Sequence, residues 1–351
     1  MRCPTLAQLP PAPAGRTGWP WTEESPQLPE AMPNGRPWPR VSIVTPSYNQ
    51  AAFLEETIRS VLLQGYPDLE YIVIDGGSTD GSVDIIRRYS PWLASWVSEP
   101  DRGQTHAINK GLRRVTGGIV AWLNADDTYM PGALSTVAAA MGPDGGPVFV
   151  FADCQQIDET SRAIDVYRGA CDGLESFHLF RAHVHQPTIF FHRALLEKVG
   201  YLDESLNFAM DCEFYMRVVA RHDFRYIPRV LANFRIHAAS KTSQDFLASI
   251  QERIAVGRKF WGASGPLRRL RYLCTERQQE AAAHLHCSYL HLGRDRRTAV
   301  MHIARAVALY PPILLGRAAM SLLFQTVIGP KRIAVLKRWL NRQPASRGSL
   351  T

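Results

Sequence analysis

The chain has 351 residues, 46% of them hydrophobic and 21% charged, which is the composition of a soluble globular protein with room for one large domain and a smaller one. Its six cysteines are scattered without a Cys-x-x-Cys pair, which indicates free thiols in a reducing compartment rather than a disulfide framework. No uninterrupted apolar run approaches about twenty residues, so the sequence predicts no transmembrane helix.

The net charge of +8 is unevenly distributed. Residues 241–351 contain 19 basic and 5 acidic residues, whereas residues 1–240 contain 21 basic and 27 acidic residues. A basic segment on a mildly acidic body favours an anionic partner, either nucleic acid or an anionic membrane surface. Nucleic acid is the weaker candidate, because no recognition motif accompanies the basic residues.

Residues 1–39 are rich in Pro, Gly and small residues and lack the continuous apolar core of a secretory signal, so we expect a disordered segment. Strands and helices then alternate. Apolar runs and periodicity predict strands at 41–45, 71–74, 96–97 and 119–123, and helices over 51–64, 82–90 and 104–115. This alternation implies parallel strands with right-handed crossovers.

Beyond residue 131 the pattern loosens into shorter strands and helices, and from about 245 to 340 the chain has helical character. We therefore expect an α/β domain over residues 40–240 and a basic helical extension over residues 241–351.

The predicted strand at 119–123 ends in Asn124 and the adjacent carboxylates of Asp126 and Asp127. Carboxylates at the mouth of a buried strand cost desolvation free energy unless a positive charge neutralises them. A divalent cation prefers such oxygen ligands and could itself hold a diphosphate. The alternative is a helix N-cap, where Asp is also favoured. By itself, the motif leaves both interpretations open.

Three other polar clusters follow predicted strands, where parallel α/β sheets bind their ligands. Residues 45–50 offer the Tyr48 ring and hydroxyls to a nucleobase, or form a simple turn. Asp75, before two glycines, could accept a hydrogen bond from a base, or begin a glycine-rich turn. Asp101 could contact a base or ribose and Lys110 a phosphate, with surface solvation as the alternative.

Residues 41–50, 75–80, 99–111 and 124–127 resemble, in order and spacing, the motif series of family-2 glycosyltransferases with a GT-A fold. The resemblance spans residues 41–240. It implies a Rossmann-like α/β/α sandwich with a central, mostly parallel mixed sheet, here followed by a C-terminal helical extension. It also implies that Thr45, Pro46, Tyr48 and Asp75 line the nucleobase pocket with Asp101 and Lys110 nearby, that Asp126 contacts ribose, and that Asp127 coordinates a divalent metal, Mn²⁺ or Mg²⁺.

Downstream residues extend the resemblance. Asp211 is similar to the family's catalytic base, although many relatives have Glu-Asp where this chain has Met210 and Asp211; Glu213 is a weaker candidate, and an N-cap is the alternative for Asp211. His237 resembles a histidine that completes the metal site in relatives, the alternative being a solvent-facing histidine. His185 and Gln186 correspond to a segment near the acceptor.

The resemblance implies an inverting, metal-dependent glycosyltransferase that moves a sugar from a nucleotide-diphosphate sugar, UDP being the expected nucleotide, to a hydroxyl of a glycan or lipid-linked acceptor in cell-surface polysaccharide or glycolipid biosynthesis. A sugar-phosphate nucleotidyltransferase and a non-catalytic nucleotide-sugar or glycan-binding module stay open as alternatives. We expect a cytoplasmic protein, with its basic extension as a candidate attachment to the inner face of the plasma membrane.

Overall fold

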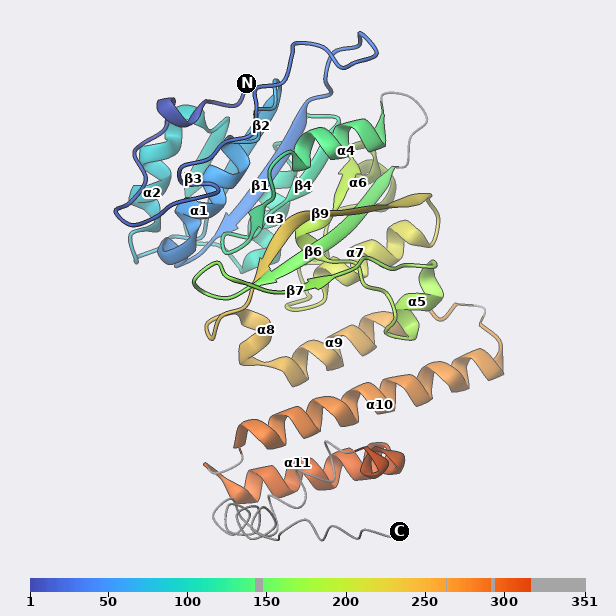
Figure 1. The fold of residues 1–351 in the computed structure, drawn as a ribbon. Helices are drawn as coiled ribbons and strands as arrows, with labels where there is room; N and C mark the ends of the chain where they lie inside the picture. The colour runs from blue at the N-terminus through green and yellow to red at the C-terminus, as the bar shows by residue number, and fades with distance from the viewer. Residues whose placement is uncertain (143–147, 263, 292–293, 317–351) are drawn as a thin grey trace, which may run out of the picture. The chain divides into compact units, whose positions relative to one another are not determined.

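The computed structural model describes residues 1–142, 148–262, 264–291 and 294–316 (Figure 1). The chain divides into two compact units, Met1–Gln244 and Asp245–Thr351. Among the described residues, no helix is both long and apolar enough to cross a membrane.

The first unit is built on a mixed sheet whose strand order is β3-β2-β1-β4-β8-β6-β9-β5, with β7 paired to β6. The strands are β1 (Val41–Ser47), β2 (Leu69–Asp75), β3 (Ser95–Ser98), β4 (Ile119–Trp122), β5 (Thr128–Tyr129), β6 (Phe149–Ile157), β7 (Ala163–Tyr167), β8 (Phe190–His192) and β9 (Phe224–Arg235). The neighbours β3, β2, β1 and β4 are parallel, as the α/β alternation predicts. Antiparallel pairs involving β5, β7 and β8 make the sheet mixed.

Helices cover both faces of this sheet (Figure 1). The helices of the first unit are α1 (Ala51–Leu62), α2 (Ser82–Tyr89), α3 (Gln104–Leu112), α4 (Ala133–Met141), α5 (Leu174–His178), α6 (Ala194–Val199), α7 (Met210–Val219) and α8 (Lys241–Gln244), with 3₁₀ turns at Leu6–Gln8, Ser90–Trp92 and Gln186–Thr188. β1 is buried at every residue, because a parallel strand covered on both faces has no solvent side. The predicted α/β/α architecture is confirmed.

The expectation of a disordered segment over residues 1–39 is wrong. The Cys3 amide donates to the Tyr66 carbonyl at 2.8 Å. Arg59 of α1 is 1% exposed, and its guanidinium donates to the carbonyls of Pro10, Pro20 and Trp21 at 2.8–3.1 Å. The segment has little regular structure, as its prolines imply. Its carbonyls nevertheless accept hydrogen bonds from the buried Arg59 guanidinium, and several of its apolar side chains are buried, among them Cys3, Leu9, Trp21 and Met32.

The second unit is helical in its described part, as predicted. It contains α9 (Phe246–Lys259), α10 (Pro266–His291), α11 (Arg296–Leu309) and a 3₁₀ turn at Pro311–Leu315. Asp245 and Asp295 cap α9 and α11 by accepting backbone N–H bonds in the first turn. The predicted helical character of residues 317–340 lies outside the described residues.

Candidate functional site

The polar clusters converge because the strands before them are parallel. The last residues of β1 and β2 are paired, Ser47 with Asp75, and β4 runs parallel beside β1. Their carboxyl ends therefore meet at one edge of the sheet, where ligands of α/β sheets bind.

Asp75 organises the loop after β2. It is fully buried, and its carboxylate accepts bonds from the amides of Gly77 and Ser78 at 3.0 and 2.9 Å and from the hydroxyls of Ser78 and Ser98 at 2.6 and 2.7 Å. These four donors occupy both carboxylate oxygens. The Asp75 carboxylate therefore shapes this loop, and its contact with a base stays a prediction.

Tyr48 and Asp101 meet over the glycine that follows Asp75. Tyr48 is 62% exposed, and a methyl group added to Gly76 would lie 3.3 Å from the Tyr48 ring and 2.7 Å from Asp101 Oδ2. Only glycine leaves this space open. The exposed Tyr48 ring and the Asp101 carboxylate therefore lie close together at the strand ends.

Thr45 and Pro46 lie beneath this surface. Both are buried, and the Thr45 hydroxyl is hydrogen-bonded to the Tyr71 hydroxyl at 3.0 Å, so the Thr45 side chain does not line an open pocket. Lys110 lies on α3, where its ammonium forms an ion pair with Glu99. This ion pair places the lysine beside the loop after β3, and its contact with a phosphate stays a prediction.

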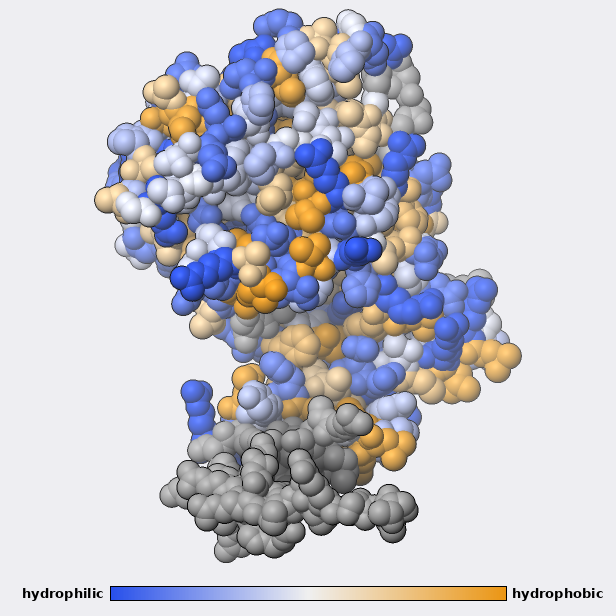
Figure 2. Space-filling model, in the orientation of Figure 1, coloured by the Kyte–Doolittle hydropathy of each residue, from blue (hydrophilic) through white to orange (hydrophobic). Residues whose placement is uncertain are grey.

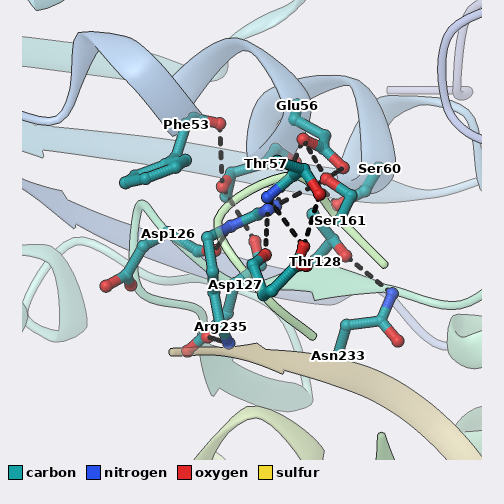
Figure 3. A network of polar contacts seen from close by, with 12 residues as sticks. Phe53, Glu56, Thr57, Ser60, Asp126, Asp127, Thr128, Ser161, Asn233 and Arg235 are labelled. Atoms are coloured by element: carbon teal, nitrogen blue, oxygen red, sulfur yellow. Dashed lines mark hydrogen bonds and ion pairs between the residues drawn. The ribbon is translucent and has the colours of Figure 1, made fainter. Parts of the chain in front are cut away.

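The structure separates the two adjacent aspartates. The Asp126 side chain is 19% exposed, and its Oδ2 lies 3.1 Å from His237 Nε2. Asp127 is fully buried: its Oδ1 accepts the Arg235 amide at 2.9 Å and its Oδ2 lies 3.4 Å from Asn124 Nδ2. Figure 3 shows the Asp126 carboxylate pointing away from the network that encloses Asp127. Asp126, rather than Asp127, therefore lies beside His237.

The environment of Asp127 also disfavours its ionised form. Burial, followed by the charge of Asp126, raises the pKa of Asp127 well above its usual range. The N-cap alternative for the pair is wrong, because Asp127 is followed by β5, and Gly132 occupies the N-cap position of α4.

Three amide side chains form a chain beside the aspartates. Gln104 Nε2 donates to Asn124 Oδ1 at 2.9 Å, Asn124 Nδ2 donates to Gln186 Oε1 at 3.0 Å, and Gln186 Nε2 donates to the Trp122 carbonyl at 2.8 Å. Gln186, assigned to the acceptor side, is thereby brought to the end of β4. The sequence offered no signal for Gln104, since an isolated glutamine is usually a surface residue.

His185 precedes Gln186 and packs against Tyr167 with a ring-centroid distance of 5.4 Å. Desolvation, followed by the charge of His183, lowers the pKa of His185 to about 4. The imidazole is therefore neutral near pH 7.

Asp211 is the second residue of α7, and Ala209 occupies the N-cap position, so the N-cap alternative for Asp211 is wrong. Its Oδ1 accepts the Cys212 amide at 2.6 Å. Glu213 is 7% exposed and forms an ion pair with Arg217 at 2.8 Å, one turn along the helix. The Glu213 carboxylate is thus committed to a structural contact, whereas Asp211 remains partly exposed.

Arg235 contacts the aspartate turn, and Glu56 and Phe53 in turn contact Arg235. None of the three was predicted as a site residue. The Arg235 side chain is fully buried and ion-paired with Glu56 at 3.1 Å, and its guanidinium lies over the Phe53 ring at 4.9 Å. The only sequence signal was a charge inside an apolar pattern: Arg235 at the end of a strand and Glu56 on the buried face of α1.

Asp126 and His237 are the candidate ligands for a divalent cation. Among the described residues, no group of three His, Cys, Asp or Glu side chains forms a ready cation cage. Asp126 and His237 nevertheless supply one oxygen and one nitrogen side by side, a pair that suits Mn²⁺ when phosphate oxygens and water complete the coordination. These two residues fit a cation that is held jointly with a diphosphate.

A family model described as "Glycosyl transferase family 2" matches residues 42–192. An uncharacterized glycosyltransferase of Mycobacterium tuberculosis is 31% identical over 51% of this chain and 68% of its own length. In two further curated relatives, 28% identical, the match covers 66% of the relative, just under two thirds of its length.

Solved structures share the fold. TarS of S. aureus, solved in complex with UDP-GlcNAc, has a TM-score of 0.54 at 16% identity, covering 82% of this chain and 89% of its own. A mannosyltransferase of Pyrobaculum calidifontis, solved with GDP-Man and Mn²⁺, has a TM-score of 0.51 at 22% identity, covering 87% and 88%. The fold is therefore GT-A, and the resemblance seen in the sequence is confirmed: the chain belongs to glycosyltransferase family 2.

Proposed function

We propose that this protein is an inverting, divalent-metal-dependent glycosyltransferase that takes its sugar from a nucleotide-diphosphate sugar. The observation that carries the proposal is the Asp126–His237 pair, placed at the same sheet edge as the exposed Tyr48 ring and Asp101. The two solved relatives, one with UDP-GlcNAc and one with GDP-Man and Mn²⁺, support a nucleotide-sugar donor.

We assign the binding of the donor to residues at the strand ends. Tyr48 and Asp101 receive the nucleoside, with Gly76 permitting close approach. Asp126 and His237 hold the cation. The role of metal ligand that the sequence predicted for Asp127 is therefore proposed for Asp126. A cation bound there offsets the negative charge that develops on the leaving diphosphate. Lys110 contributes positive charge near the phosphates.

Asp211 is the proposed catalytic base. It lies in the first turn of α7, where the partial positive charge of the helix N-terminus favours a carboxylate. The carboxylate takes the proton of an acceptor hydroxyl as that oxygen attacks the anomeric carbon, and the electron pair of the broken C–O bond leaves with the diphosphate. A single displacement inverts the anomeric carbon, with UDP proposed as the nucleotide.

Replacing Asp211 by Asn tests this assignment. We expect Asp211→Asn to lower transfer by about 10²- to 10⁴-fold, because the general base is lost, while nucleotide affinity stays the same. Glu213→Gln is the matched control on the same helix: it loosens Arg217 and lowers the melting temperature, yet keeps transfer. Wild-type transfer in Asp211→Asn, or loss of transfer only in Glu213→Gln, would contradict the assignment.

The sugar-phosphate nucleotidyltransferase alternative is less well supported. That class is expected to carry a glycine-rich, arginine-containing loop after its first strand. Here β1 passes into α1 through Tyr48, Asn49 and Gln50, with Asn49 in the left-handed region at φ 50°.

We also propose that the protein works at the cytoplasmic face of an anionic membrane on a glycan or lipid-linked acceptor. The start of α10 exposes Leu267 by 84% and Leu270 by 57%, and Arg268, Arg269 and Arg271 are exposed beside them. Hydrophobic and hydrophilic surface lie side by side on the helices of the second unit (Figure 2). Such a mixture suits the interface of an anionic bilayer.

A further inference from the structure

Arg235 ends β9, two residues before His237, and its side chain lies entirely inside the protein. Its Nε donates to the Asp126 carbonyl at 2.8 Å, and its backbone amide donates to Asp127 Oδ1 at 2.9 Å. One residue therefore anchors both members of the aspartate pair (Figure 3).

Glu56 of α1 holds this arginine in place. Its carboxylate lies 3.1 Å from Arg235 Nη2, and the Ser161 hydroxyl donates to both Glu56 oxygens at 2.8 and 3.0 Å. Arg235 Nη1 also donates to Ser161 Oγ at 2.9 Å and to the Asp158 carbonyl at 3.1 Å. The ion pair thus joins α1, the β6–β7 turn, the aspartate turn and the end of β9.

The same arrangement positions His237. The His237 ring packs against the Phe53 ring at a centroid distance of 4.7 Å, and the Arg235 guanidinium lies 4.9 Å from the same ring. Phe53 and Glu56 are both on α1, one turn apart. Arg235 therefore binds the Asp126 carbonyl and also contacts the Phe53 ring, against which His237 packs.

We infer that the buried Glu56–Arg235 ion pair is the positioning element of the donor cation site, holding Asp126 Oδ2 and His237 Nε2 3.1 Å apart. The inference rests on the proposed function, because it takes Asp126 and His237 as the cation ligands. Neither Glu56 nor Arg235 touches the cation or the sugar. Partners that orient ligands in this way typically change metal affinity by about 10- to 100-fold.

Arginine is required by the geometry. The guanidinium fork contacts an anion, two carbonyls, a hydroxyl and an aromatic face, and a lysine ammonium cannot reach these groups at once. Arg235→Lys keeps the charge and loosens the turn, and Glu56→Gln keeps the shape and removes the counter-charge. Ser161→Ala is a milder third variant, which deletes one hydroxyl of the network.

The experiment measures Mn²⁺ affinity by calorimetric titration in the presence of UDP and without acceptor. We expect Arg235→Lys and Glu56→Gln to weaken Mn²⁺ binding about 10-fold or more, and Ser161→Ala to weaken it less. In steady-state assays the variants should need more Mn²⁺ for half-maximal rate, and saturating Mn²⁺ should restore kcat, which misfolding would not allow.

Arg59→Lys is the matched control. Arg59 is also a buried arginine, on the same helix, but it binds the N-terminal segment. We expect it to lower the melting temperature and leave Mn²⁺ affinity unchanged. The inference is overturned if Ser161→Ala, Glu56→Gln and Arg235→Lys all bind Mn²⁺ like the wild type, or if Arg59→Lys weakens binding equally. Wild-type protein that binds no Mn²⁺ with UDP would instead overturn the proposed cation site itself.

Discussion

Asp126 and Asp127 are adjacent and chemically identical, yet their surroundings give them different chemistry. Asp126 keeps part of its carboxylate at the surface beside His237, whereas Asp127 is enclosed and bound by the Arg235 amide. The sequence located the pair from the apolar strand that precedes it. The sequence could not tell which aspartate is buried, because the burial of Asp127 depends on β9, which begins almost a hundred residues later in the chain.

The different surroundings of Asp126 and Asp127 predict that substituting them changes Mn²⁺ affinity to different extents. Asp126→Asn removes a cation ligand and should weaken Mn²⁺ binding in the presence of UDP more than about 10-fold. Asp127→Asn should change the affinity far less, because Asp127 is fully buried, its carboxylate is bound by the Arg235 amide, and Asp126 rather than Asp127 lies beside His237. Titration of both variants with Mn²⁺ and UDP checks this. An affinity loss confined to Asp127→Asn would return the ligand role to Asp127.

His185 predicts a pH dependence of stability. Burial lowers its pKa from 6.5 to about 4, so the unfolded chain takes up this proton at a higher pH than the folded chain does. Stability is therefore lost as the pH falls from about 6.5 towards about 4, by about 2 kcal/mol between pH 7.5 and pH 5. Urea unfolding should show this loss in the wild type and a smaller loss in His185→Gln. Equal losses in both proteins would show that His185 does not cause it.

Among the elements, those with local signals were predictable. The apolar runs at 41–45 and 119–123 became β1 and β4, and the periodic stretch at 51–64 became α1. The parallel pairing of β1, β2 and β4 followed from the α/β alternation, which also brought the polar clusters together. The position of β9 between β6 and β5 in the sheet was not predictable, because it depends on contacts between segments that are distant in the sequence.

The N-terminal segment shows where composition misleads. Proline-rich composition predicts missing secondary structure correctly but does not reveal what the irregular chain packs against. Here the partner is Arg59. From the sequence its side chain would be expected at the surface, but it is buried and donates hydrogen bonds to backbone carbonyls of the N-terminal segment.

Helix α10 carries the prediction for membrane binding. Leu267 and Leu270 are exposed at its start among three arginines, so the double substitution Leu267→Glu and Leu270→Glu should abolish flotation with vesicles that contain phosphatidylglycerol. Leu290→Glu, at the other end of α10, is the control and should float like the wild type. Vesicles of phosphatidylcholine alone should bind more weakly. Undiminished flotation of the double variant would exclude this surface.

At the scale of the whole molecule, the family and the fold follow from the comparisons, whereas the reaction rests on the arrangement of a few side chains. The first unit contains every residue assigned to the donor and to catalysis, within Met1–Gln244. Asp126, His237 and Asp211 come from three separate parts of that unit. The proposed reaction therefore depends on how the fold brings these three side chains together, and an activity assay on the full chain tests it as a whole.

The most direct test is nucleotide release from a panel of UDP-, dTDP- and GDP-sugars, with water as the stand-in acceptor. The proposed function predicts release from a UDP-sugar in Mn²⁺ or Mg²⁺, suppression by EDTA, and loss in Asp126→Asn. Release that is indifferent to EDTA, or no release from any donor while the protein is folded, would contradict it.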